Sequence, residues 1–116
     1  MPKKEPITGT PSRHTGTINW IYGGGGEDHG VLTQAILRSE REIAIDCHCD
    51  GNIYTMVLRS VDGINFSGEC RGRRDGETWF PVFNSKRWTN QKGLLLLGKW
   101  IEEGDESYCV IELCLD

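Results

Sequence analysis

The chain has 116 residues, enough for one domain with a single modest core. Its formal net charge of -4 argues against general nucleic-acid binding, because affinity for phosphates depends mainly on lysine and arginine. The 15 glycines, about twice the usual share, predict many tight turns and therefore many short strands.

The lack of a targeting segment and the odd number of cysteines both favour the cytoplasm. The longest apolar run, over residues 93–98, is far shorter than the roughly 20 residues of a membrane helix, and residues 1–10 lack the apolar core of a signal peptide. An odd number of cysteines, 5, cannot pair fully within one chain. We therefore expect a soluble protein of a reducing compartment, with no membrane partner.

The first third of the chain combines a tail, a strand and a glycine run. Residues 1–14 contain three prolines and no apolar periodicity, which predicts a disordered tail. A first strand is predicted over residues 17–22, and it ends at four glycines, 23–26, that no regular element favours. Residues 31–38 are predicted as a strand, although their pattern also suits a short helix.

The middle of the chain shows the clearest strand patterns. Over residues 42–50 apolar and cysteine side chains occupy every second position, as in a half-buried strand. The Asp50-Gly51 turn leads into a strand over residues 53–60. After the Asp62-Gly63 turn, residues 64–71 alternate again.

The last third continues the pattern with aromatic strands. A turn is predicted over residues 72–76, followed by a strand over 78–83, in which Pro81 indicates an edge or bulge position. Trp88 and residues 90–93 are predicted to lie in the next connection.

The chain is predicted to end in a hairpin, and its links define the architecture. Residues 94–101 and 107–115 form this hairpin around Gly104-Asp105. The result is about eight short strands whose links are too short for parallel crossovers. Closure into an up-and-down barrel removes exposed strand edges. The predicted fold class is therefore all-β, an antiparallel meander that forms a closed or nearly closed barrel over residues 15–116. An open sheet or two packed sheets are the alternatives.

Four segments carry a resemblance to known small barrels. They are Gly16 with Trp20, residues 51–54, residues 62–68 and residues 93–100. On these segments the chain resembles the calycin group of lipocalin, fatty-acid-binding and avidin-like barrels, at pattern level, over about 100 residues. Lipocalins carry the glycine and tryptophan two positions apart, whereas here they are four apart, and no biotin-site motif of avidins aligns. The resemblance implies that the barrel can enclose a binding cavity, and it transfers no ligand residue.

Two motifs resemble a metal site and a phosphate loop, but neither has the residue arrangement that such a site requires. Cys47-His48-Cys49 has zinc-ligand residue types, but on a strand the cysteines point one way and the histidine the other. All five cysteines occupy apolar-face positions in the predicted strands, so we interpret them as buried small side chains and predict no metal and no cofactor.

Residues 23–30 lack the ending of a phosphate loop and carry two acids. They are predicted to form a plain connection or a loop over the barrel mouth.

Aromatic and arginine side chains provide the candidate ligand site. Four tryptophans and Tyr54 exceed what a small core needs, although packing alone remains an alternative. Arg71, Arg73 and Arg74 lie near one predicted hairpin and suit a phosphate or carboxylate. Arg71 and Arg73 share a face if their strand continues past Gly72. The predicted ligand-binding residues are Trp20, Tyr54, Arg71, Arg73, Trp79, Trp88 and Trp100.

Three functions remain open at this point. The first is a non-enzymatic module that binds a small molecule, anionic if the arginines contribute, at an aromatic mouth near the basic hairpin. The second is a protein-interaction or inhibitor domain, monomeric or homodimeric, that uses its acidic final hairpin or a strand edge. The third is an enzyme that uses the loop around His29, which we favour least because no nucleophile set can be assembled.

Overall fold

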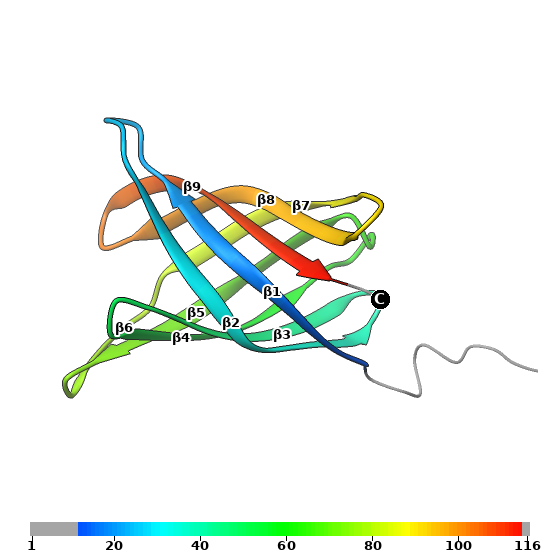
Figure 1. Cartoon of the computed structure of the whole chain (residues 1–116), viewed down its shortest axis with the longest axis horizontal. Coiled ribbons are helices and arrows are strands. Elements are labelled where there is room, and N and C mark those ends of the chain that lie inside the picture. The colour runs from blue at the N-terminus through cyan, green and yellow to red at the C-terminus, as the bar shows by residue number, and fades with distance from the viewer. Residues whose placement is uncertain (1–11, 115–116) are drawn as a thin grey trace, which may run out of the picture.

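One antiparallel sheet runs through residues 12–114, which are the residues that the computed structural model describes (Figure 1). Its strands are β1 (Ser12–Ile21), β2 (Glu27–Ser39), β3 (Glu42–Cys49), β4 (Asn52–Arg59), β5 (Asn65–Arg74), β6 (Glu77–Trp79), β7 (Val82–Thr89), β8 (Gly93–Glu102) and β9 (Asp105–Cys114). The prediction of an all-β antiparallel meander is confirmed, and residues 31–38 belong to a strand rather than a helix.

The sheet closes into a barrel of eight strands. β1 pairs with β9 and β4 pairs with β5, which completes the ring β1-β2-β3-β4-β5-β7-β8-β9. The short β6 pairs with the last part of β5, while β7 pairs with its first part. Pro81 lies between β6 and β7, so the strand expected over residues 78–83 is interrupted there. Closure leaves no open sheet of the kind considered as the alternative.

Several element bounds differ from the expected ones. β1 begins at Ser12, and residues 12–14, expected in the tail, pair with residues 35–37 of β2. Residues 1–11 of the expected tail lie outside the described residues. β2 begins at Glu27, so the connection expected over residues 23–30 is a shorter turn closed by a bond from Tyr22 N to Gly26 O. β5 continues through Gly72 to Arg74, and Trp88 lies within β7.

The middle of the barrel is filled by inward-facing side chains from the strands of the ring. The buried hydrophobic residues are Ile18, Trp20, Leu32, Ala35, Ile43, Ile45, Cys47, Cys49, Tyr54, Met56, Leu58, Phe66, Cys70, Phe83, Leu94, Leu96, Trp100, Cys109, Ile111 and Leu113. An eight-strand barrel has an interior just wide enough for side chains to fill, and here they do so. Free space inside the barrel therefore lies at its two ends.

Glycines let neighbouring strands approach closely enough for the barrel to curve. A Cβ at Gly98 of β8 would lie 1.9 Å from the Asn84 carbonyl oxygen of β7. A Cβ at Gly16 of β1 would lie 1.9 Å from the Glu112 carbonyl oxygen of β9. Only a residue without a side chain fits such a backbone approach, which is why glycine marks tight bends in barrel strands.

Candidate functional site

The barrel has one pocket at each of its two ends, where a meander alternately places its turns, and more open grooves elsewhere on its surface. The end with the β1–β2, β3–β4, β5–β6 and β8–β9 turns, on the left in Figure 1, holds a pocket of about 420 Å³. The end with the β2–β3, β4–β5 and β7–β8 turns holds a pocket of about 820 Å³. We call them the acidic end and the apolar end after the side chains that line them. Both volumes suit a small molecule.

Four of the predicted ligand-binding residues form one aromatic cluster at the acidic end. Trp20 contacts Tyr54 and Trp100, with ring centroids 5.5 and 5.4 Å apart. Tyr54 contacts Trp100 and Trp79 edge to face, at 5.5 and 6.1 Å. Edge-to-face contacts are the arrangement that aromatic quadrupoles favour. The residues come from β1, β4, β6 and β8, so barrel closure brings them together.

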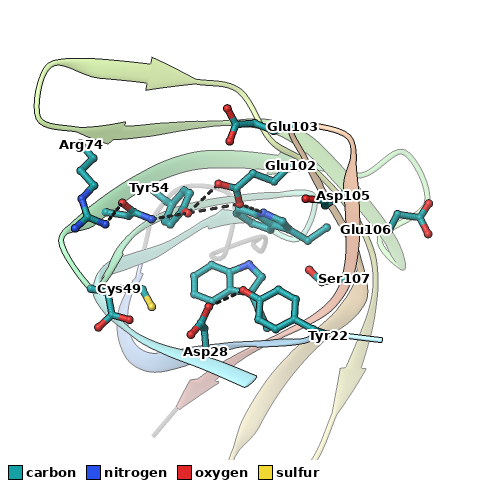
Figure 2. Close-up of a pocket in the computed structure, with 14 residues that line it drawn as sticks. Tyr22, Asp28, Cys49, Tyr54, Arg74, Glu102, Glu103, Asp105, Glu106 and Ser107 are labelled. Carbon is teal, nitrogen blue, oxygen red and sulfur yellow. Dashed lines mark hydrogen bonds between the residues drawn. The ribbon is translucent and has the colours of Figure 1, made fainter. Parts of the chain in front are cut away.

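The Glu102 carboxylate binds the polar atoms of this cluster. It accepts hydrogen bonds from Trp100 Nε1 at 2.7 Å and from the Tyr54 hydroxyl at 3.1 Å (Figure 2). It also accepts one from Trp79 Nε1. Burial, with the adjacent Glu102 charge, raises the pKa of Tyr54, so its hydroxyl stays protonated and donates. Trp100 and Glu102 are two positions apart on β8 and therefore point to the same side of the strand.

The rim of the acidic end carries a strong excess of negative charge. The charged residues that line its pocket are six carboxylates and one guanidinium, from Asp28, Asp50, Glu102, Glu103, Asp105, Glu106 and Arg74. Arg74 donates to Asn52 Oδ1 at 3.3 Å and lies 3.8 Å from the Asp75 carboxylate. Asp28 accepts from the Tyr22 hydroxyl at 2.6 Å, and burial together with this bond raises the pKa of Tyr22. An anion would meet repulsion at this end.

The other three predicted ligand-binding residues lie on the outer wall, where Arg71 lines an open groove of about 580 Å³. Arg71 and Arg73 share a face, as expected if β5 continues, but both are exposed, whereas the intervening Gly72 is buried. Trp88 is 50% exposed on β7, where the Lys86 ammonium lies 5.3 Å from the centre of its ring. Arg74, the third arginine of the predicted basic hairpin, lines the mouth instead.

His29 also lies away from both end pockets. Its Nδ1 is hydrogen-bonded to Asn19 Oδ1, and its Nε2 is 3.7 Å from Glu27. Neither pocket is lined by His29, so the arrangement required by the enzyme hypothesis, with this histidine facing an acid across a cleft, is not formed at either end.

The pocket at the apolar end combines hydrophobic walls with two guanidinium groups and two carboxylates, those of Glu40 and Asp62. Its hydrophobic lining residues are Leu37, Ile43, Ile64, Phe66 and Leu94. Arg87 is half-buried and Arg41 is exposed, and neither forms an ion pair with another residue of 12–114. The ring of His14 is fixed by Ser12 Oγ at 2.8 Å and by the Cys114 carbonyl oxygen at 3.1 Å.

The Asp62 carboxylate at this end is engaged in local hydrogen bonds. It accepts from the Ile64 and Asn65 amides at 2.9 and 2.8 Å and from the side chains of Asn65 and Ser60. These bonds, the Asn65 amide first, lower the pKa of Asp62 well below its ordinary range. The loop is also fixed by the bond from Arg87 N to Ile64 O at 2.7 Å, which positions Ile64 at the pocket.

The cysteine motif does not form a metal site within the described residues. Cys47 and Cys49 are buried while His48 is exposed, as strand alternation predicts. Residues 12–114 hold no group of three or more histidine, cysteine, aspartate or glutamate side chains placed to bind a metal ion. The expectation that all cysteines face the core is wrong for Cys114, which is exposed because it directly follows the inward-facing Leu113.

The thiols are expected to divide sharply in reactivity. Burial raises the pKa of Cys47 and Cys70 to about 12 and that of Cys109 well above its ordinary value. At mildly alkaline pH, Ellman's reagent should therefore modify Cys114 rapidly and the other cysteines only after unfolding. The check is the absorbance released before and after adding denaturant. Fast modification of a second thiol in the folded protein would contradict the described packing.

Comparison with known proteins gives no relative from which a function could be transferred. No family model matches the chain, and neither a curated protein nor a solved structure matches it. Among residues 12–114, no helix has the length and apolar character needed to cross a membrane. The candidate sites are therefore interpreted from their own geometry.

Proposed function

We propose that this chain is a small-molecule-binding barrel of calycin type whose ligand is an apolar anion held at the apolar end. One observation carries the proposal: a pocket of about 820 Å³ combines hydrophobic walls with two arginines that form no ion pair within residues 12–114. Eight strands with next-neighbour connections are also the arrangement of lipocalins, which supports the calycin assignment.

The apolar lining supports a ligand with a hydrocarbon or aromatic body. The exposed surface of Ile64 and the half-buried side chain of Leu37 would lose contact with water when such a body binds. Removing apolar surface from water contributes about 25 cal/mol per Å². The ligand body supplies most of the binding free energy in this interpretation, and the charged group supplies orientation.

The charge distribution supports an anionic group on this ligand. The Arg87 guanidinium is half-buried beside the apolar walls, where an unpaired charge gains most from a carboxylate or phosphate partner. Two carboxylates, Asp62 and Glu40, also line the pocket; that of Asp62 is already bound by the loop amides, and that of Glu40 forms no ion pair with either arginine. We therefore keep the prediction of an anionic ligand, which was first inferred from Arg71 and Arg73. The binding site that we propose for its charged group is at Arg87 and Arg41.

Replacing Arg87 by methionine is the direct test, because it removes the charge and keeps an unbranched side chain. Decanoate, the probe, is expected to bind the unchanged protein and to bind Arg87→Met on the order of tenfold more weakly, about 1.4 kcal/mol. Isothermal titration calorimetry measures both affinities. Decyltrimethylammonium, which has a similar chain and the opposite charge, should bind more weakly than decanoate.

The matched control is Arg71→Met, which makes the same change on the outer wall of β5. Its decanoate affinity should equal that of the unchanged protein. If Arg71→Met weakens binding and Arg87→Met does not, the basic hairpin is the anion site and the present assignment is wrong. If decanoate does not bind at all, the proposed function fails.

A further inference from the structure

We propose a second ligand site at the acidic end, for a small organic ammonium compound that also carries a hydroxyl or carbonyl oxygen. This site is separate from the one proposed above, because no residue lines both pockets. Two independent features define it: an excess of carboxylates around the rim, and a buried hydrogen-bond donor without a partner.

The carboxylates supply the attraction for the ammonium group. Six of them line a pocket of about 420 Å³, and Arg74 is the one guanidinium among the lining residues. The Arg74 charge is already shared with Asn52 and Asp75. Carboxylates gathered around a concavity with protein walls focus the electrostatic potential on its interior, which concentrates cations there.

The unpartnered donor is Nε1 of Trp20. Trp20 lines the same pocket and is 4% exposed, and its Nε1 has no hydrogen-bond partner among residues 12–114. A buried donor that has lost water and gained no acceptor destabilises the folded state. The donors of Tyr54, Trp79 and Trp100 already bind Glu102, so an acceptor for Trp20 has to come from elsewhere. A ligand oxygen would supply it after a shift of the indole toward the pocket, because Nε1 has almost no surface open to solvent.

The geometry favours a primary ammonium group over a quaternary one. Quaternary ammonium ions are recognised by the open faces of aromatic rings. Here the rings of Trp20 and Tyr54 are 4% exposed and that of Trp100 is 1% exposed, so their faces are covered by one another. Carboxylate oxygens accept hydrogen bonds, and a primary ammonium group offers three donors to them.

The indole N–H resonances give the test a separate signal for each tryptophan. Ethanolamine is the probe, titrated at neutral pH and followed by ¹H–¹⁵N spectra. The Nε1–H signal of Trp20 should shift most, and that of Trp88, on the outer wall, should not shift. Ethylamine, which lacks the hydroxyl, should move the Trp20 signal less, and acetate should leave it in place. A response to acetate equal to that to ethanolamine, or no response to ethanolamine, would overturn the proposal.

A charge-removing variant with a matched control completes the test. The double change Asp50→Asn and Asp105→Asn removes two rim charges, and asparagine tolerates the φ of 49° at position 50. Ethanolamine affinity should fall on the order of tenfold. Glu112→Gln removes an exposed carboxylate from β9, outside the pocket lining, and should leave the affinity unchanged. Equal affinities in all three proteins, or binding of a lysine-rich peptide with no effect of ethanolamine, would contradict a small-molecule site.

Discussion

Replacing Glu102 by alanine is expected to lower the free energy of unfolding by about 3 kcal/mol, because each buried donor left without a partner costs about 1–3 kcal/mol. Trp79 Nε1, Trp100 Nε1 and the Tyr54 hydroxyl all lose their acceptor at once. Trp100 is 1% exposed, so water cannot replace the lost oxygen without repacking. Urea unfolding followed by tryptophan fluorescence measures the change.

Two further variants separate this effect from the loss of a charge. Glu102→Gln keeps one acceptor oxygen and should recover about half of the lost stability. Glu112→Ala removes an exposed carboxylate from the neighbouring β9 and should change stability by less than about 0.5 kcal/mol. A loss below about 1 kcal/mol in Glu102→Ala would mean that the three donors are not held as described.

Gly98→Ala is expected to destabilise the barrel by about 3 kcal/mol or to prevent folding, since overpacking that must displace backbone costs at least 1–3 kcal/mol. The added Cβ would lie 1.9 Å from the Asn84 carbonyl oxygen and 2.5 Å from the Ser85 Cα, both backbone atoms of β7. The strands have to separate to admit it, which weakens the β7–β8 ladder. Thermal unfolding followed by circular dichroism measures the effect.

The matched change is Gly24→Ala in the β1–β2 turn. A Cβ at Gly24 meets no atom within 4 Å and its φ is not positive, so stability should change by less than about 0.5 kcal/mol. If Gly98→Ala is as stable as Gly24→Ala, the close approach of β7 and β8 does not exist in solution.

Local patterns were sufficient to predict the strands and several of their faces. Alternation over β3 correctly placed Cys47 and Cys49 inside the barrel and His48 outside. The Asp50-Gly51 turn was found because positive φ at both positions, 49° and 87°, restricts residue choice. Both signals act over a few residues, so a single sequence contains them fully.

Gly72 shows where local interpretation failed. It was assigned to a turn, but it lies inside β5, where a Cβ would be 2.6 Å from the Trp79 ring. The glycine is required by a packed indole and not by a turn. Ending the strand early also grouped Arg74 with Arg71 and Arg73 at one hairpin, whereas Arg74 lies on the same strand face as Gly72 and reaches the acidic end.

The apolar-end pocket could not be predicted because no local motif describes it. Its residues come from the start of β1, the end of β2, the β4–β5 loop and the β7–β8 hairpin, which meet only after the barrel closes. His14 had been assigned to the tail, and Arg87 stood beside a predicted connection. The register of β1 with β9 and of β4 with β5 determines these neighbours, and a single sequence does not encode it in a readable form.

The most direct test of the proposed function is a decanoate titration followed in methyl and indole spectra together. Binding at the apolar end predicts shifts of the Leu37, Ile43 and Leu94 methyl signals and constant Nε1–H signals of Trp20 and Trp100. Shifts of those two indole signals with constant methyl signals would place the anion at the acidic end and contradict the account.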